Sequence, residues 1–348
     1  MNKLKESIQQ TGENNKKVGR AKASMVIIIG FAALILLMLF SITRGAAEIP
    51  LKTVWDALSR FDEGNTRHLI VVNIRLPRVI ASALIGAAFA VAGAIMQGIT
   101  RNPMADSGLM GLNAGACFAL SLCFAFFPSM AYRYIIIFAF LGAAFGAMLV
   151  SGIASMRRGG VTPMRLVLAG AAVSALLTAL SQGIALYFNV AQDIMFWTTG
   201  GVASSDWEQI RLIMPWITAA LLGAIFLSRS ISLLSLGEDV AKGLGLNTTL
   251  VNALCFLIVL ILAGASVSVV GAVGFVGLIV PHLTRFLVGM DYRWIIPSSA
   301  VLGAFLVVAA DLGARMLNPP FETPLGAIIA LVGVPFFIYL ARKQRRAL

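Results

Sequence analysis

Two arginines stand at the start of a long apolar stretch, and a polar break stands at its end. Arg75 and Arg78 are three residues apart, so on a helix both guanidinium groups lie on one face. Guanidinium groups pair well with carboxylates and phosphates. After the apolar run, Asn102 and Pro103 interrupt the pattern and Asp106 follows in a glycine-containing loop. These residue types predict a path through a bilayer. A binding site for an acidic group is expected at one end of it and a flexible constriction at the other.

No catalytic or metal-binding set can be assembled from the sequence. The chain has no G-x-x-x-x-G-K-[ST] motif for a nucleotide, and its two histidines, His68 and His282, are far apart. Asp193 and Asp311 fall near predicted helix ends, and Arg315, four residues after Asp311, can pair with it. Ion-coupled carriers usually place ionisable residues in mid-membrane. We therefore expect neither an enzyme nor a bound cofactor or metal, and we expect the energy for transport to come from a partner.

The composition is that of an integral membrane protein. The 348 residues are 59% hydrophobic and 12% charged, with a mean hydropathy of +0.90, whereas soluble domains carry about 25% charged residues. In lipid, a long apolar segment satisfies its backbone hydrogen bonds as a helix, so the predicted fold class is all-α. Ten ranges are predicted to span: 25–43, 76–98, 107–127, 132–155, 163–188, 209–230, 249–271, 273–290, 293–312 and 324–342.

The charges indicate how these ten helices are oriented. An even number of spans places the tails, 1–24 and 343–348, on the same side of a single bundle, 25–342. That side holds 18 of the 27 basic and 6 of the 15 acidic residues, which accounts for the whole net charge of +12. By the positive-inside rule, both termini are predicted to be cytoplasmic. The positive charge therefore predicts contact with membrane lipid and no nucleic acid partner.

One predicted cytoplasmic loop has the pattern of a short amphipathic helix. Leu236, Val240 and Leu244 recur every four residues and form one apolar stripe, while Glu238 and Lys242 are placed to form an i,i+4 ion pair. Such a helix can rest on the lipid surface or dock into a groove of a cytoplasmic protein. The pattern alone leaves both alternatives open.

Several longer motifs together resemble a known family. RLPR, TRNPMADSGLMGLNAGA, LGEDVAKGLGL, GFVGLIVPHLTR and ETPLGAIIALVGVPFFIYL occur in this order over roughly residues 70 to 345. They resemble the FecCD family, the membrane subunits of bacterial ABC importers for ferric siderophores, haem and vitamin B12. The resemblance implies a permease of the type II ABC importer kind, with ten helices and cytoplasmic termini, in the bacterial cytoplasmic membrane.

The resemblance also implies partners and site residues. The partners are a second permease subunit, either a copy or a paralogue, two cytoplasmic ATPases that use Mg-ATP, and an extracytoplasmic substrate-binding protein. Arg75, Arg78 and Arg315 match basic positions that receive acids of the binding protein, although they could instead be interfacial anchors. The stretch 235–246 matches the coupling helix that seats in the ATPase. The implied coupling residues are Leu236, Gly237, Glu238, Val240, Ala241, Leu244 and Gly245.

The predicted path and cargo follow from the same matches. Asn102 and Met104 match the inner gate, Thr162 is a looser match, and Met96, Gln97, Met110 and Asn113 are predicted to lie along the path. This mild, mixed surface suits a bulky chelate that keeps its metal. An iron siderophore is the predicted cargo because it is the commonest in the family, with haem and vitamin B12 as alternatives. An ion-coupled secondary carrier and a non-transporting scaffold are the alternatives of other classes.

Overall fold

The computed structural model describes residues 2–45, 48–156, 163–199, 201–319 and 321–345, and within these ranges every regular element is a helix. In chain order they are α1 (Asn2–Thr43), α2 (Leu51–Ser59), α3 (Thr66–Leu69), η1 (Ile70–Arg75), α4 (Leu76–Ile99), η2 (Ser107–Met110), α5 (Leu112–Phe126), α6 (Tyr132–Ser155), α7 (Pro163–Tyr187), α8 (Ala191–Thr199), α9 (Trp207–Ser235), α10 (Glu238–Gly243), α11 (Thr248–Val270), α12 (Val276–Val288), α13 (Tyr292–Leu317) and α14 (Leu325–Arg345). Of these, η1 is a π-helix and η2 a 3₁₀-helix. The predicted all-α fold is confirmed.

Seven helical segments in the described ranges are long and apolar enough to cross a membrane. They are Arg20–Thr43, Thr66–Ile99, Tyr132–Ser155, Met164–Tyr187, Trp207–Ser235, Thr248–Val270 and Tyr292–Leu317. Three shorter apolar helices accompany them: Leu112–Phe126, Val276–Val288 and Leu325–Leu340. Each range predicted from hydropathy overlaps one of these helices. The helix α1 runs without a break from Asn2 into the first apolar range, so residues of the predicted tail continue the first membrane helix.

Backbone geometry explains why two of the predicted ranges contain shorter α-helices. The range 107–127 opens with the single turn η2, and Gly111 then takes a φ of 71° before α5 begins. In the range 273–290, Phe275 has a φ of 67°, and α12 starts only at the next residue. A left-handed residue interrupts an α-helix. Hydropathy does not register such interruptions.

The helix that carries the two arginines begins well before them. α3, η1 and α4 form one continuous helical segment, Thr66–Ile99, whereas the predicted span starts at residue 76. Pro77, in the first turn of α4, has no N–H to donate. The π-helix η1, whose hydrogen bonds join residues five positions apart, precedes it and continues the helical path. Arg75 and Arg78 therefore lie within a helix and not at its tip.

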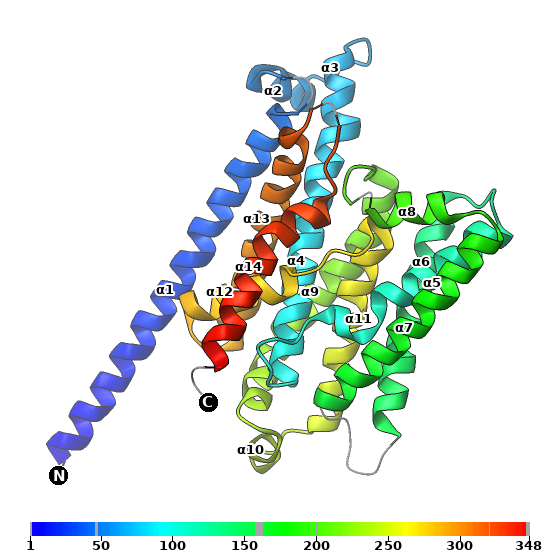
Figure 1. Cartoon of the computed structure of the whole chain (residues 1–348). Helices are drawn as coiled ribbons and strands as arrows, with labels where there is room; N and C mark the ends of the chain where they lie inside the picture. Colours follow the sequence, from blue (N-terminus) through cyan, green and yellow to red (C-terminus); the bar gives the residue numbers. More distant parts are fainter. Residues whose placement is uncertain (1, 46–47, 157–162, 200, 320, 346–348) are drawn as a thin grey trace.

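α4 runs through the centre of the bundle (Figure 1). It contacts α9, α11, α12 and α13, and 83% of the most apolar window in Thr66–Ile99 is buried. A Cβ added to Gly86 would lie 2.3 Å from the carbonyl oxygen of Gly303 on α13, so the two backbones are in direct contact. The small residues on this face of α4 therefore let it pack closely against α13.

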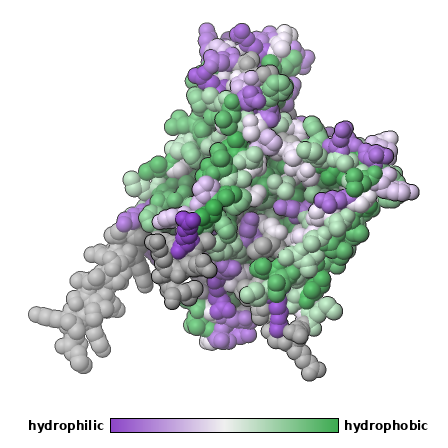
Figure 2. All heavy atoms as spheres, in the orientation of Figure 1, coloured by the Kyte–Doolittle hydropathy of each residue, from purple (hydrophilic) through white to green (hydrophobic). Residues whose placement is uncertain are grey.

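The two ends of the bundle differ. Figure 1 shows α2 and α3 at one end, called here the outer end, while α10 and both chain termini lie toward the other, called the inner end. In Figure 2, hydrophobic side chains cover the middle of the visible face, and hydrophilic ones gather at the top and at the bottom. This banding is that of a helix bundle surrounded by lipid between two aqueous layers.

Candidate functional site

Two arginines near the outer end pair with one carboxylate, and a third arginine lies beside them. Arg78 donates from Nε and Nη2 to Oδ1 of Asp311 at 2.9 and 2.8 Å, and from Nη1 to Glu322 at 2.6 Å. Arg315, one turn after Asp311 on α13, pairs with the same carboxylate at 3.1 Å. The third arginine, Arg75, lies near Arg315 across the turn that follows α1. The pairing of Asp311 with Arg315 predicted from their spacing is confirmed, and the sequence pattern did not reveal the second arginine on Asp311.

This outer arginine cluster, Arg75, Arg78, Asp311 and Arg315, is buried within the chain. The exposed fractions are 6%, 6%, 1% and 8% in that order. Arg75 donates to the backbone carbonyl of Ile42 at 2.6 Å, and Arg315 donates to neighbouring carbonyls at the end of α1. A buried charge is stable only when it is paired and hydrogen-bonded. The cluster therefore ties α1, α4 and α13 together, and docking of a partner on its arginines stays a prediction.

The predicted inner gate is a tight turn after α4. Arg101 has a φ of 50°, which ends the helical path of the backbone. The side-chain oxygen of Asn102 then accepts a hydrogen bond from the amide of Met104 at 2.9 Å, and both residues are half-buried. Asn102 thus shapes its own turn, as asparagine commonly does. Thr162 lies outside the described residues.

The predicted path residues on α4 lie inside the subunit. Met96 is fully buried and Gln97 is 3% exposed. Gln97 donates from Nε2 to the carbonyl of Gly277 at 3.1 Å and accepts a hydrogen bond from Arg285, so it bonds to both ends of α12. Asn113, at the start of α5, is half-buried. Gln97 therefore joins α4 to α12, and the place of these residues on a transport path stays a prediction.

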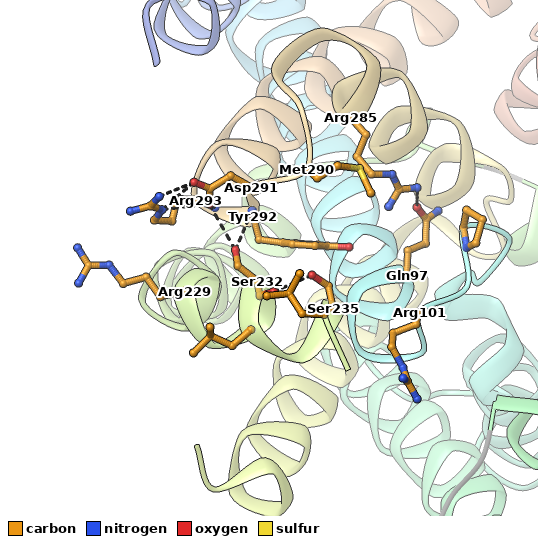
Figure 3. Close-up of a pocket in the computed structure, with 13 residues that line it drawn as sticks. Gln97, Arg101, Arg229, Ser232, Ser235, Arg285, Met290, Asp291, Tyr292 and Arg293 are labelled. Carbon is orange, nitrogen blue, oxygen red and sulfur yellow. Dashed lines mark hydrogen bonds and ion pairs between the residues drawn. The ribbon is translucent and has the colours of Figure 1, made fainter. Parts of the chain in front are cut away.

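A cavity of about 830 Å³ opens where the inner ends of α4, α9, α12 and α13 meet (Figure 3). In Figure 3, Arg285 reaches toward Gln97 on one side, Tyr292 extends between the helices, and Arg229 and Arg293 lie on the opposite side. The lining residues are Gln97, Arg101, Pro103, Arg229, Ser232, Leu233, Ser235, Leu236, Arg285, Met290, Asp291, Tyr292 and Arg293. Residues of both the gate turn and the start of the coupling stretch therefore line the cavity.

The coupling stretch predicted at 235–246 is a shorter helix with two flanks. α10 has only six residues because Gly237, with a φ of 130°, precedes it and Gly245, with a φ of 83°, follows it. Leu236, Val240 and Leu244 are 66%, 50% and 63% exposed. The apolar stripe predicted from the spacing is therefore directed away from the bundle of this chain.

α10 is attached firmly to the bundle on its other side. Ala241 is fully buried, and the hydroxyl of Thr248 at the start of α11 donates to Glu238 at 3.3 Å. Glu238 also pairs with Lys242 at 2.9 Å, which confirms the predicted i,i+4 pair. Hydrogen bonding to Lys242, followed by the positive charges of Lys242 and Arg101, lowers the pKa of Glu238. The guanidinium after α4 therefore lies close to the coupling stretch.

The described ranges hold no group of three or more His, Cys, Asp or Glu residues that could bind a metal ion. Sequence reasoning missed two long-range contacts, Arg78 with Asp311 and Gln97 with Arg285. For the contact of Arg78 with Asp311, the sequence offered only an aspartate near a predicted helix end, with more than one arginine that could pair with it. For the second, a glutamine in an apolar run was the only hint.

Comparison with known proteins identifies the family. The model of the FecCD transport family matches residues 33–343. The chain belongs to the FecCD transport family. One FecCD-type relative is the iron(3+)-hydroxamate import system permease protein FhuB of Bacillus subtilis (strain 168), which is 52% identical over 326 residues, covering 94% of this chain and 85% of that protein. The hemin transport system permease protein HmuU of Yersinia pestis is 34% identical, covering 94% of this chain and 98% of that protein.

A solved structure has the same fold. This FecCD chain superimposes on a metal-chelate type ABC transporter in an inward-facing conformation with a TM-score of 0.80 and 26% sequence identity. The match covers 92% of this chain and 99% of the solved one. The resemblance that the sequence motifs indicate is confirmed, and it extends to the first membrane helix.

Proposed function

We propose that this chain is the membrane-spanning permease subunit of an ABC importer for an iron chelate, in the bacterial cytoplasmic membrane. The observation that carries the proposal is the exposed stripe of Leu236, Val240 and Leu244 at the inner end of the bundle. A contiguous apolar surface of this kind marks a binding site for a partner. In this family the partner is the ATPase, and ATP hydrolysis takes place on that separate subunit.

The proposed topology has ten membrane crossings and cytoplasmic termini. Seven long and three shorter apolar helices support ten crossings. The concentration of basic residues on the inner side supports its assignment to the cytoplasm. Two such subunits, either copies or paralogues, would enclose the path between them, with two ATPases below and one binding protein above.

The proposed coupling mechanism follows from how α10 is attached. The ATPases bind the exposed stripe, and their closure on Mg-ATP moves α10 together with α9 and α11, because Ala241 and Thr248 anchor it to both. Arg101 lies between α10 and the gate turn, so displacement of α10 reaches Asn102 and Met104. Alternating access results when nucleotide binding favours one arrangement of these contacts over the other.

At the outer end, the binding protein is proposed to dock on the outer arginine cluster. Arg78 already holds Asp311 and Glu322, so a carboxylate of the partner has to replace one of them. Glu322 is 43% exposed on its side chain, whereas Asp311 is buried, so Glu322 is the group that exchanges. A neutral Arg75→Gln change tests docking better than charge reversal at Arg78, which would place a third carboxylate in the cluster.

The cargo is proposed to be a ferric siderophore. The relative with 52% identity is named for iron(3+)-hydroxamate, and others are named for iron(3+)-citrate and enterobactin. The relative named for hemin shares 34% identity. These names favour a hydroxamate-type iron chelate as the first cargo to test, with haem second.

Reconstitution tests the proposed function. The full chain, purified together with its ATPase and binding protein, should take up a radioactive ferric hydroxamate into vesicles only when Mg-ATP is supplied on the ATPase side. Hemin and cobalamin, tested in parallel, should be taken up less. Uptake by the chain alone, driven by an ion gradient without ATP, would show that it is a secondary carrier.

A further inference from the structure

The inner cavity carries a positive charge that its own lining does not neutralise. Arg101, Arg229 and Arg285 line it, whereas Asp291 is the single acid among its described lining residues. Asp291 already holds the fourth lining arginine, Arg293, at 2.5 Å. An excess of cationic groups around a partly enclosed cavity favours binding of an anion there.

The neighbouring acid outside the lining is also engaged. Glu238 lies near Arg101, whose positive charge helps to lower its pKa. Its carboxylate, however, already pairs with Lys242 at 2.9 Å. Arg285 bonds to the neutral side chain of Gln97, which leaves its charge uncompensated. Among the described residues, Arg101, Arg229 and Arg285 are thus the lining arginines that form no ion pair with a carboxylate, and they lie on different sides of the cavity (Figure 3).

The cavity lies at the inner ends of membrane-spanning helices, where the headgroup layer of a bilayer is expected. Its residues come from the last turns of α4, α9 and α12 and the first turn of α13, where four membrane helices end together. Hydroxyl groups of Ser232 and Tyr292 border it as further polar groups. Basic pockets between helix ends on the cytoplasmic side are typical sites for acidic lipid headgroups.

Large apolar side chains at the end of α12 and just after it are exposed on the surface of this chain. Phe286 is 85% exposed and Met290, on the cavity rim, is 76% exposed. Leu287 lines a separate apolar groove of about 380 Å³ between α1, α12 and α13, with Lys22 at its end. An apolar surface for acyl chains therefore lies beside a cavity that attracts a phosphate. A lipid would use both surfaces, whereas a water-soluble anion would use only the cavity.

We propose that the inner cavity is a binding site for the headgroup of an anionic phospholipid, with the phosphate near Arg285 and the acyl chains over Met290 and Phe286. Because the cavity lies between the gate turn and the coupling stretch, a bound lipid would contact both. The proposal concerns a site on this chain alone and does not depend on the identity of its cargo or its partners.

Competition between two lipids tests the proposal. The full chain, purified in detergent and stripped of lipid, is mixed with equal amounts of phosphatidylglycerol and phosphatidylcholine, and the retained lipid is measured by native mass spectrometry. Arg229→Gln and Arg101→Gln should each lower the preference for phosphatidylglycerol about fivefold, as expected for one arginine near a membrane surface. Both side chains are exposed, so the variants should fold even if Arg285→Gln does not.

Arg211→Gln is the matched control, since Arg211 is an exposed arginine at the opposite end of the same helix as Arg229. It should leave the lipid preference unchanged. Equal phosphatidylglycerol retention in Arg229→Gln and Arg211→Gln would overturn the proposal. So would displacement of the lipid by millimolar inorganic phosphate, which would identify a site for a free anion. Loss of ATPase binding with unchanged lipid retention would instead assign the arginines to an acidic protein partner and would also overturn it.

Discussion

Replacing Asp311 by asparagine removes the charge that two buried arginines share while it keeps the size of the side chain. Arg78 and Arg315 both pair with this carboxylate, and all three side chains are less than a tenth exposed. Breaking a buried ion pair by removing one partner costs about 3–5 kcal/mol. Because Arg78 keeps Glu322 and Arg315 keeps backbone carbonyls of α1, we expect the lower end, about 3 kcal/mol.

The assay is thermal unfolding of the detergent-purified chain. At roughly 2 °C per kcal/mol for a chain of this size, Asp311→Asn should lower the melting temperature by about 6 °C. Glu322→Gln is the matched control, because its partner Arg78 is the same but its side chain is 43% exposed. An exposed pair contributes about 0–1 kcal/mol, so the control should melt within about 2 °C of the wild type. If Asp311→Asn melted like the control, the buried pairs would not be what holds α4 to α13.

Two further changes test packing and capping. Gly86→Ala would push a methyl group against the carbonyl of Gly303 and should destabilise the folded chain by about 1–3 kcal/mol. Gly183→Ala should not destabilise it, because an added Cβ there would meet no atom of a neighbouring element within 4 Å, and thermal unfolding compares the two variants. Burial opposes ionisation of Asp291, but hydrogen bonds and charge from Arg293 outweigh it and hold its pKa below the ordinary 3.8. The stability that this carboxylate contributes is therefore complete above pH 3.8 and lost as the pH falls through the lower folded value, and Asp291→Asn should remove that part of the acid dependence of unfolding.

Hydropathy predicted the helices well because lipid leaves an apolar segment no alternative to a helix. It failed where the conformation of a single residue or the register of the hydrogen bonds determines where a helix begins or ends. The break at Phe275, the early start of the helix at Thr66 and the shortness of α10 depend on single φ angles and on hydrogen-bond register. None of these changes the mean hydropathy of a window.

The parts of the site that depend on residues close together in the sequence could be predicted. The exposed stripe and the pair of Glu238 with Lys242 follow from the four-residue spacing, and both are present, although only Val240 of the stripe lies within α10. Arg78 and Asp311 are 233 residues apart, so their contact follows only from the way α4 packs on α13. The inner cavity likewise exists only because four helices end together, which no single segment encodes.

The coupling of ATP hydrolysis to transport through α10 is tested most directly by Val240→Asp in the assembled transporter. Val240 is half-exposed on the stripe, so the permease itself should fold normally, as its melting temperature would verify. Asp239→Asn, the adjacent exposed position off the stripe, is the control. We predict that Val240→Asp abolishes binding-protein-stimulated ATP hydrolysis and uptake, while Asp239→Asn retains both. Unchanged stimulation of the ATPase by the Val240→Asp transporter would contradict the assignment of α10 as the coupling element.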